Sequence, residues 1–164
     1  MDRIWSPWRY KYVSRAAAGD ACIFCSKSAE VRDPENYVLY RGEHNFVLLN
    51  LFPYTSGHLM IAPYRHVPRL VDCGSPELAE MIDLARDAER ALTEVYRPQG
   101  LNLGMNLGEC AGAGIAGHIH MHVLPRWLGD ANFMTTVGET RVLPEDLDVS
   151  YQKLRAVFRS STPL

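Results

Sequence analysis

The feature that most constrains this chain is the alternation of histidine with apolar residues from His118 to Leu124. A β-strand points successive side chains to opposite faces, so the three histidines would share one face and Ile119, Met121 and Val123 the other. The second set suits a hydrophobic core. Core burial does not explain three imidazoles, which ionise near neutral pH. This face is therefore predicted to hold a metal or a phosphate, or to carry covalent chemistry at phosphorus.

Length and composition exclude several classes of protein. The chain has 164 residues, of which 47% are hydrophobic and 22% charged, with a net charge of −2. This size fits one domain, and the mixed charges give no basic face for polymeric nucleic acid. No segment has about 18 consecutive apolar residues, and no apolar export signal opens the chain. We therefore predict a cytoplasmic protein without a membrane partner, whose four cysteines are thiols or metal ligands rather than disulfides.

The hydrophobic pattern predicts an antiparallel α+β fold. Predicted strands cover residues 37–40, 46–50, 58–62, 101–105 and 118–124. A long helix is expected from Ser75, as its N-cap, to Val95, with apolar residues at helical spacing before the stop signals Pro98 and Gly100. A second helix is expected after Pro144. Strands joined by hairpins, with one long helix inserted, are typical of this fold class.

One domain is expected over residues 1–164, without a linker or repeat. It would comprise an N-terminal segment (1–35) that is aromatic and contains two cysteines, a core (36–125), and a C-terminal extension with a helix (126–164). The early aromatic residues, including Trp5 and Trp8, either pack on the body or a second subunit, or form a lid that stacks on a base.

These residues together resemble the histidine triad family. The run from His118 to Leu124 matches its motif, in which three histidines alternate with apolar residues, and the agreement extends upstream through 46–50, 57–60 and Pro63 to Asn106. Segments 5–9 and 126–134 are similar to the bacterial branch that contains diadenosine tetraphosphate phosphorylases. The resemblance implies a five-stranded antiparallel sheet with two helices and a homodimer in which the sheets and long helices meet.

The resemblance also implies that His120 is a nucleophile that accepts a nucleotidyl group. Chemistry supports this role, because a neutral imidazole attacks phosphorus readily and divides one difficult displacement into two. His122 would donate to the phosphate oxygens or the leaving group. By position in the family motif, Asn50 would contact the ribose hydroxyls and Asn106 the phosphate.

A glycine-rich stretch precedes the histidines, and its backbone could approach a phosphate closely through Gly112, Ala113 and Gly114. Relatives that hydrolyse diadenosine triphosphate have glutamines in this loop. Here Asn106, Ala113 and Gly114 occupy it, so this chain departs from that branch. His58, on the strand expected beside the histidine strand, is left open as a site residue.

Cys22 and Cys25 allow several interpretations. A redox pair is disfavoured because no βαβ pattern surrounds it; two buried thiols or half of a tetrahedral zinc site remain. Relatives complete such a site with a histidine after the third strand and the first triad histidine, which correspond here to His66 and His118. The resemblance thus implies a structural zinc and no redox cofactor. Cys73 and Cys110 lack this spacing and are taken as ordinary residues.

The leading functional hypothesis is an enzyme acting on a small nucleotide. It would cleave diadenosine tetraphosphate to ATP and ADP with phosphate as acceptor, through a nucleotidyl-His120 intermediate. A nucleoside phosphoramidase or a dinucleoside polyphosphate hydrolase would use the same nucleophile with water. A nucleotide sensor with incidental turnover stays open as an alternative of another class.

Overall fold

The computed structural model describes residues 22–131 and 145–160. The strands are β1 (Val38–Arg41), β2 (Asn45–Leu49), β3 (Leu59–Pro63), β4 (Gly100–Met105) and β5 (Met121–Arg126). The helices are α2 (Ile23–Ala29), α3 (Asp33–Asn36), α4 (Ser75–Tyr96) and α6 (Leu147–Ser160), with short 3-10 turns η1 (Leu70–Asp72) and η2 (Glu109–Ala111). The predictions for the aromatic N-terminus and for residues 132–144 lie outside the described residues.

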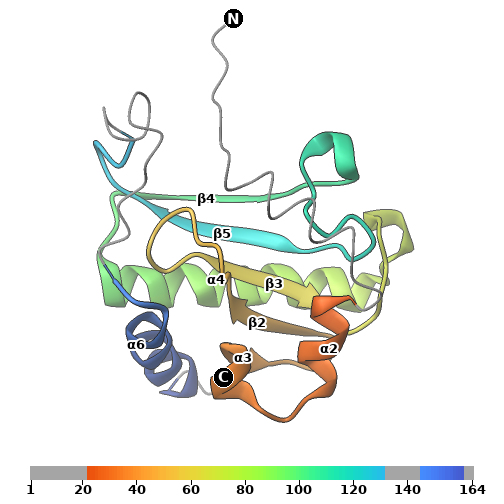
Figure 1. The fold of residues 1–164 in the computed structure, drawn as a ribbon, viewed down its shortest axis with the longest axis horizontal. Helices are drawn as coiled ribbons and strands as arrows, with labels where there is room; N and C mark the ends of the chain where they lie inside the picture. The colour runs from red at the N-terminus through yellow and green to blue at the C-terminus, as the bar shows by residue number, and fades with distance from the viewer. Residues whose placement is uncertain (1–21, 132–144, 161–164) are drawn as a thin grey trace, which may run out of the picture.

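The strands form one antiparallel sheet in the order β1-β2-β3-β5-β4, as predicted (Figure 1). The pairing that matters for the site joins β3 to β5, with Met60 opposite His122 and Leu59 opposite Val123. β4 forms one edge of the sheet and β1 the other. The long helix α4, a second long helix and all five strands confirm the predicted fold class.

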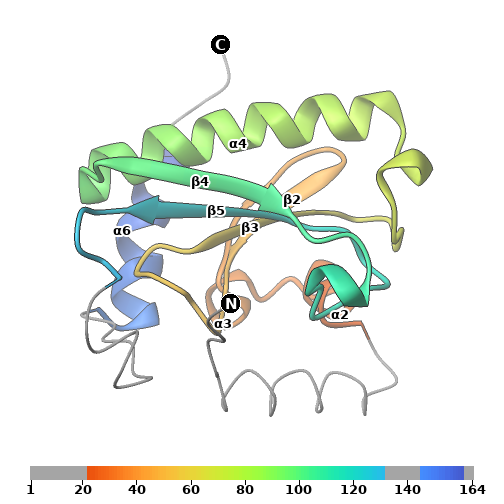
Figure 2. The same cartoon turned by 90° about the horizontal axis from the view of Figure 1, so that it is seen from above.

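Two clusters of buried side chains cover the two faces of the sheet. On one face, strand residues such as Ile61 and Val123 pack against α4 and against Leu154 and Phe158 of α6. On the other face, a smaller cluster includes Phe24 of α2 together with residues of β1, β2 and β3. Figure 2 shows α4 and α2 on opposite sides of the sheet. This alternation is what the period of two in the strands predicts.

Helix α4 begins differently from the prediction. Its N-cap is Gly74, and Ser75 is the first helical residue. The carboxylate of Glu77 accepts a hydrogen bond from the Gly74 N–H at 2.6 Å, so an acidic side chain, rather than the serine hydroxyl, closes the first turn. Ile82, predicted within the apolar spacing, is 61% exposed because it lies outside the arc that Met81 and its neighbours bury.

The histidine segment pairs as a strand only from Met121 onward. Before that point the Ile119 N–H donates to the carbonyl of Val67, beyond the end of β3. Pro63 has no N–H to continue the ladder, and its carbonyl accepts a hydrogen bond from His118. The predicted strand 118–124 is therefore three residues shorter at its start.

The turn between β1 and β2 is held by α4. The carboxylate of Glu80 accepts hydrogen bonds from the backbone N–H groups of Glu43, His44 and Asn45 at 2.6–2.8 Å, and from the Asn45 side chain at 2.8 Å. This carboxylate thus fixes the first hairpin on the long helix. Over the described ranges, no helix combines the length and apolar character needed to cross a membrane.

Candidate functional site

The three histidines of the motif lie on the face of the sheet that carries α2. His118 and His120 are buried and His122 is partly exposed. The rings of His120 and His122 meet edge to face, with centroids 4.9 Å apart. Their apolar neighbours Met121 and Val123 belong to the core on the opposite face. The alternation in the sequence therefore produces the predicted division between chemistry and core.

The imidazole of His120 is fixed by the backbone of its neighbour. Its Nδ1 lies 2.9 Å from the carbonyl oxygen of His118, which can only accept a hydrogen bond. Nδ1 therefore carries the proton, and Nε2 presents a lone pair. Burial lowers the pKa of His120 below its usual 6.5, partly offset by this hydrogen bond. The neutral, nucleophilic form is thus favoured at neutral pH.

His122 is oriented by His58. Nδ1 of His58 faces the backbone N–H of Tyr54 at 3.2 Å and must accept, so the proton of a neutral His58 lies on Nε2. That Nε2 lies 2.9 Å from Nδ1 of His122 and donates to it. The proton of His122 consequently lies on Nε2, the nitrogen that can donate to a phosphate oxygen or a leaving group. His58, left open from the sequence, thus hydrogen-bonds to the third histidine of the motif and orients its ring.

Asn50 lies directly behind this pair. Its side-chain amide is 3.3 Å from Nδ1 of His58, and its side-chain oxygen accepts the N–H of Phe52 at 3.0 Å. Tyr54 adds a ring contact to His58, with centroids 4.8 Å apart. The loop after β2 therefore supports the histidine pair, and the predicted ribose contact of Asn50 stays a prediction.

The glycine-rich loop closes on itself. Asn106 donates from its side chain to the carbonyl of Gly112 at 3.3 Å, which ties the two ends of the loop together. The N–H groups of Gly112 and Ala113 donate to the carbonyls of Glu109 and Gly108. Gly112 has a φ of 92°, a conformation that favours glycine. These two amides are already paired within the loop, so any phosphate contact of Gly112, Ala113 or Gly114 stays a prediction.

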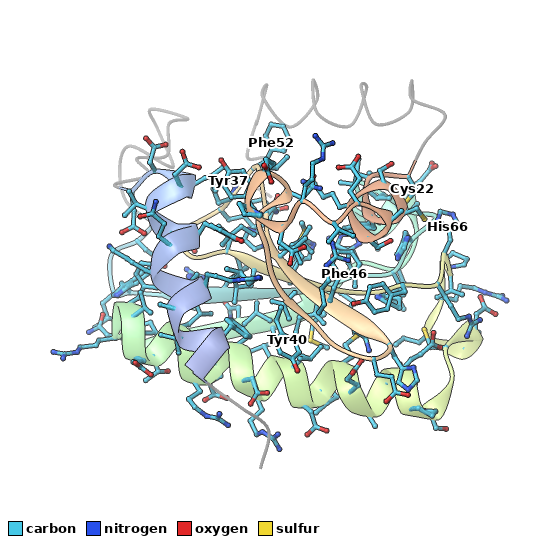
Figure 3. The ribbon with its side chains drawn as sticks, turned by 90° about the horizontal axis from the view of Figure 1, so that it is seen from below. Cys22, Tyr37, Tyr40, Phe46, Phe52 and His66 are labelled. Carbon is cyan, nitrogen blue, oxygen red and sulfur yellow. The ribbon has the colours of Figure 1, made fainter. Side chains whose placement is uncertain are left out.

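The four predicted metal ligands meet at one point. The ligand atoms of Cys22, Cys25, His66 and His118 all lie within 4.8 Å of one another. Figure 3 shows Cys22, at the start of α2, beside His66 from the segment after β3. The sulfur of Cys22 is 3.3 Å from Nδ1 of His118, and that of Cys25 is 3.3 Å from Nδ1 of His66. The first of these contacts joins Cys22 to His118, which lies 96 positions later in the chain.

The cluster has the chemistry of a zinc site. Zinc bound by two sulfurs and two nitrogens in a tetrahedron places its ligand atoms about 3.3–3.8 Å apart, and three of the four separations between Cys and His ligand atoms here are 3.3, 3.3 and 3.6 Å, and the fourth is no more than 4.8 Å. His118 donates from Nε2 to the Pro63 carbonyl at 2.8 Å, which leaves Nδ1 as the ligand atom. Burial raises the pKa of Cys25, helped by the neighbouring Cys22. A cation among the sulfurs would oppose that rise.

Phe24, which the sequence did not single out, completes the site. It is 1% exposed, and its ring lies against both His118 and His120, with centroid separations of 5.1 and 4.8 Å. No motif marks this residue, since a phenylalanine between two cysteines is indistinguishable from an ordinary core residue.

Comparison with known proteins places this geometry in a family. A model of the HIT domain matches residues 32–127, more than half of the chain. An AP-4-A phosphorylase from Mycobacterium tuberculosis is 40% identical over 153 residues, which cover 88% of this chain and 78% of that protein. An asymmetrical bis(5'-nucleosyl)-tetraphosphatase from Schizosaccharomyces pombe is 32% identical over 93 residues, 57% of this chain and 50% of that protein.

A solved structure agrees in fold. A zinc-bound histidine triad family protein from Mycobacterium smegmatis superposes with a TM-score of 0.68 at 27% identity, and the match covers 85% of this chain and 94% of that one. The HIT domain model matches more than half of the chain, the phosphorylase is 40% identical to it, and the three histidines of the motif lie on one face of the sheet. The chain therefore belongs to the histidine triad family.

Proposed function

We propose that this enzyme cleaves dinucleoside polyphosphates by transferring a nucleotidyl group to Nε2 of His120. The observation that supports it best is the pair of fixed proton positions. The His118 carbonyl holds a proton on Nδ1 of His120, and His58 leaves one on Nε2 of His122. A nucleophile and a proton donor thus stand on rings 4.9 Å apart. The names of the two relatives reported above fit the same substrate class.

The reaction follows from these positions. The lone pair of His120 Nε2 attacks the α-phosphorus, and an N–P bond forms while the P–O bond to the departing nucleotide breaks. The N–H at Nε2 of His122 donates a hydrogen bond to the leaving oxygen, which stabilises the negative charge that builds up there as the nucleotide departs. With diadenosine tetraphosphate the leaving group is ATP. Inorganic phosphate then attacks the adenylyl group, the N–P bond breaks, and ADP is released.

The substrate contacts proposed from the family motif fit around these two histidines. Asn50 would meet the ribose hydroxyls, and Asn106 with the loop at Gly112, Ala113 and Gly114 would lie along the phosphates. Asn50 is supported by its place in the hydrogen-bond network behind His58. A phosphate could accept hydrogen bonds from the backbone N–H groups of Gly112 and Ala113 only if these groups gave up their present hydrogen bonds within the loop.

We further propose that the cluster of Cys22, Cys25, His66 and His118 binds a structural zinc. All four positions are taken by protein ligands, so the ion would cross-link the segments rather than meet substrate. The related protein from Mycobacterium smegmatis is described as zinc-bound. Two thiol ligands need a reducing compartment, which favours action in the cytoplasm.

A homodimer is supported by the two sheet edges, which differ. The carbonyls of Val38 and Leu39 at the β1 edge accept hydrogen bonds from Arg155 of α6. At the β4 edge Leu103 is 49% exposed. Among residues 22–131 and 145–160, no strand pairs with the outer edge of β4. An edge strand with an exposed apolar side chain favours pairing with another strand, which a second copy of this chain would supply. Ile82, exposed on α4, is a further apolar group that a second copy could cover.

Product analysis tests the function and identifies the acceptor. The enzyme is incubated with diadenosine tetraphosphate, with and without inorganic phosphate, and the nucleotides are separated. ADP and ATP formed only with phosphate are the expected result. AMP and ATP in both buffers would mean that water takes the nucleotidyl group. No product in either buffer would contradict the proposal and favour a phosphoramidase or a nucleotide sensor.

A further inference from the structure

The ring of Phe24 lies between the metal cluster and the nucleophile. It projects from α2 between the two cysteines and contacts His120 at a centroid separation of 4.8 Å with an interplanar angle of 37°. The same ring contacts His118 at 5.1 Å. His122 contacts the ring of His120 edge to face. The imidazole of His120 is thus packed against two rings.

This packing restrains the rotation of the His120 ring, which the hydrogen bond to the His118 carbonyl does not do by itself. A single bond at Nδ1 fixes one point of the imidazole, but rotation about the Cβ–Cγ bond of a histidine has broad minima. The face of Phe24 limits that rotation and therefore the direction of the Nε2 lone pair. Attack at phosphorus depends steeply on direction, since a misplacement of about 1 Å costs roughly a hundredfold in rate.

Phe24 also faces a ring that becomes charged. When Nε2 bonds to phosphorus and Nδ1 keeps its proton, His120 becomes a substituted imidazolium. An aromatic ring close to a cation attracts it through its quadrupole. The contact is therefore stronger after attack than before, which is the requirement for an interaction that accelerates a reaction.

The position of Phe24 depends on how α2 is attached. The helix has seven residues and no side-chain cap at its N-terminal end, so it does not hold its place by itself. Arg41 secures its C-terminal end by donating to the carbonyls of Lys27 and Ser28. The N-terminal end, next to Phe24, is tied to the histidine segment through the contacts of Cys22 and Cys25.

We infer that Phe24 is a positioning residue for His120, and that the Cys22–Cys25–His66–His118 cluster supports turnover by holding Phe24 against the nucleophile. This inference rests on the proposed role of His120 as nucleophile. It assigns the cluster a part in the reaction although none of its ligand atoms meets the substrate.

The test compares leucine variants at two matched phenylalanines. F24L removes the ring beside His120. F46L removes an equally buried ring of the same core cluster, labelled in Figure 3, and this ring stacks on Tyr64 instead. We expect F24L to lower kcat on the order of tenfold or more, with the affinity for AMP and the zinc content unchanged. F46L should change kcat by less than about twofold, because its ring has no part in directing Nε2. Equal kcat in the two variants would refute the inference.

A spectroscopic measurement keeps the test independent of substrate. Long-range proton–nitrogen NMR spectra of the histidine rings report which nitrogen carries the proton. Wild type and F46L should show His120 protonated on Nδ1 alone, and F24L a mixture of the two forms. An unchanged His120 signal in F24L would refute the inference, whether or not the wild-type enzyme forms product. Absence of product with wild type would contradict only the proposed function.

The role of the cluster is tested by removing its metal. Chelation, followed by metal analysis to verify the loss, should lower kcat in wild type and much less in F24L, since both changes release the same contact. Equal fold-losses in the two proteins, or full activity of metal-free wild type, would refute the part assigned to the cluster.

Discussion

His58 and His122 are joined by a hydrogen bond of 2.9 Å between Nε2 and Nδ1, across neighbouring strands and 64 positions of sequence. The residue after His58 pairs with Val123, and Met60 pairs with His122, so the two histidines are diagonal neighbours on one face of the sheet. Because His58 accepts from the Tyr54 N–H, the proton arrangement of the whole pair is determined by backbone. The hydrogen-bond donor of the proposed reaction, Nε2 of His122, is thus set by a residue outside the triad.

Replacing His58 should lower turnover without abolishing nucleotide binding. In H58A, His122 loses the donor that keeps its proton on Nε2, and we expect kcat to fall on the order of ten- to a hundredfold. The affinity for AMP, measured by calorimetry, should change little. In a double-mutant cycle with H122A the losses should be far from additive. Full additivity would show that His58 does not act through His122.

The sequence predicted those parts of the site that lie close together along the chain or belong to a family motif. The period of two placed the triad on one face opposite Met121 and Val123, and the motif supplied Cys22 and His66 as partners. The sequence also placed the strand of His58 beside the histidine strand, but it could not predict the register that brings His58 to His122, because register between strands distant in sequence follows from the packing of the whole sheet. For the same reason Phe24 resembled an ordinary core residue.

Loss of a metal ligand should destabilise the fold. In C22S the cluster has three good ligands instead of four, so we expect zinc content to fall and the melting temperature to drop by about 10 °C, which corresponds to a few kcal/mol in a domain of this size. C73S is the matched control, because Cys73 lies outside the cluster. Calorimetry and metal analysis of both variants provide the measurement. Zinc-free wild-type protein of unchanged stability would contradict a structural metal.

The hydrogen bonds that Glu80 accepts from the turn between β1 and β2 predict that wild type and a Glu80→Gln variant differ in stability by an amount that depends on pH. Burial acts to raise the pKa of Glu80, but hydrogen bonds from the Asn45 side chain and from three backbone N–H groups outweigh it and lower the pKa below its usual 4.5. The stabilisation is therefore complete above pH 4.5 and is lost as the pH falls through the lowered pKa of the folded state.

E80Q should therefore be less stable than wild type by about 2 kcal/mol at pH 7. The difference should shrink at pH values below the folded-state pKa, where the wild-type carboxyl is also neutral. Urea unfolding at several pH values measures it, with E89Q as a control on the same helix. A difference independent of pH would assign the effect to side-chain packing instead of charge.

The exposed β4 edge predicts how a dimer would respond to charge. L103K places an ammonium group on an edge strand, where charged side chains oppose pairing with another strand. If two copies meet at this edge, the variant should be monomeric by light scattering under conditions where wild type is dimeric. Lys153 lies on α6, away from β4, so K153A serves as control. A dimeric L103K would move the interface elsewhere.

The last prediction concerns the covalent intermediate. In H120N the amide can still fill the space and meet substrate, but it has no basic nitrogen to form an N–P bond, so turnover should fall to background while AMP binding persists.

In H122N the nucleophile is intact and the imidazole N–H that faces the leaving group is lost. The leaving nucleotide then has no imidazole N–H to stabilise the charge on its oxygen, so formation of the adduct should slow. A leaving group that is a weaker base should restore part of the rate. Mass spectrometry of rapidly quenched wild-type enzyme should find one adenylyl group, on the peptide containing His120. An adduct on another peptide, or turnover by H120N, would contradict the assignment of the nucleophile.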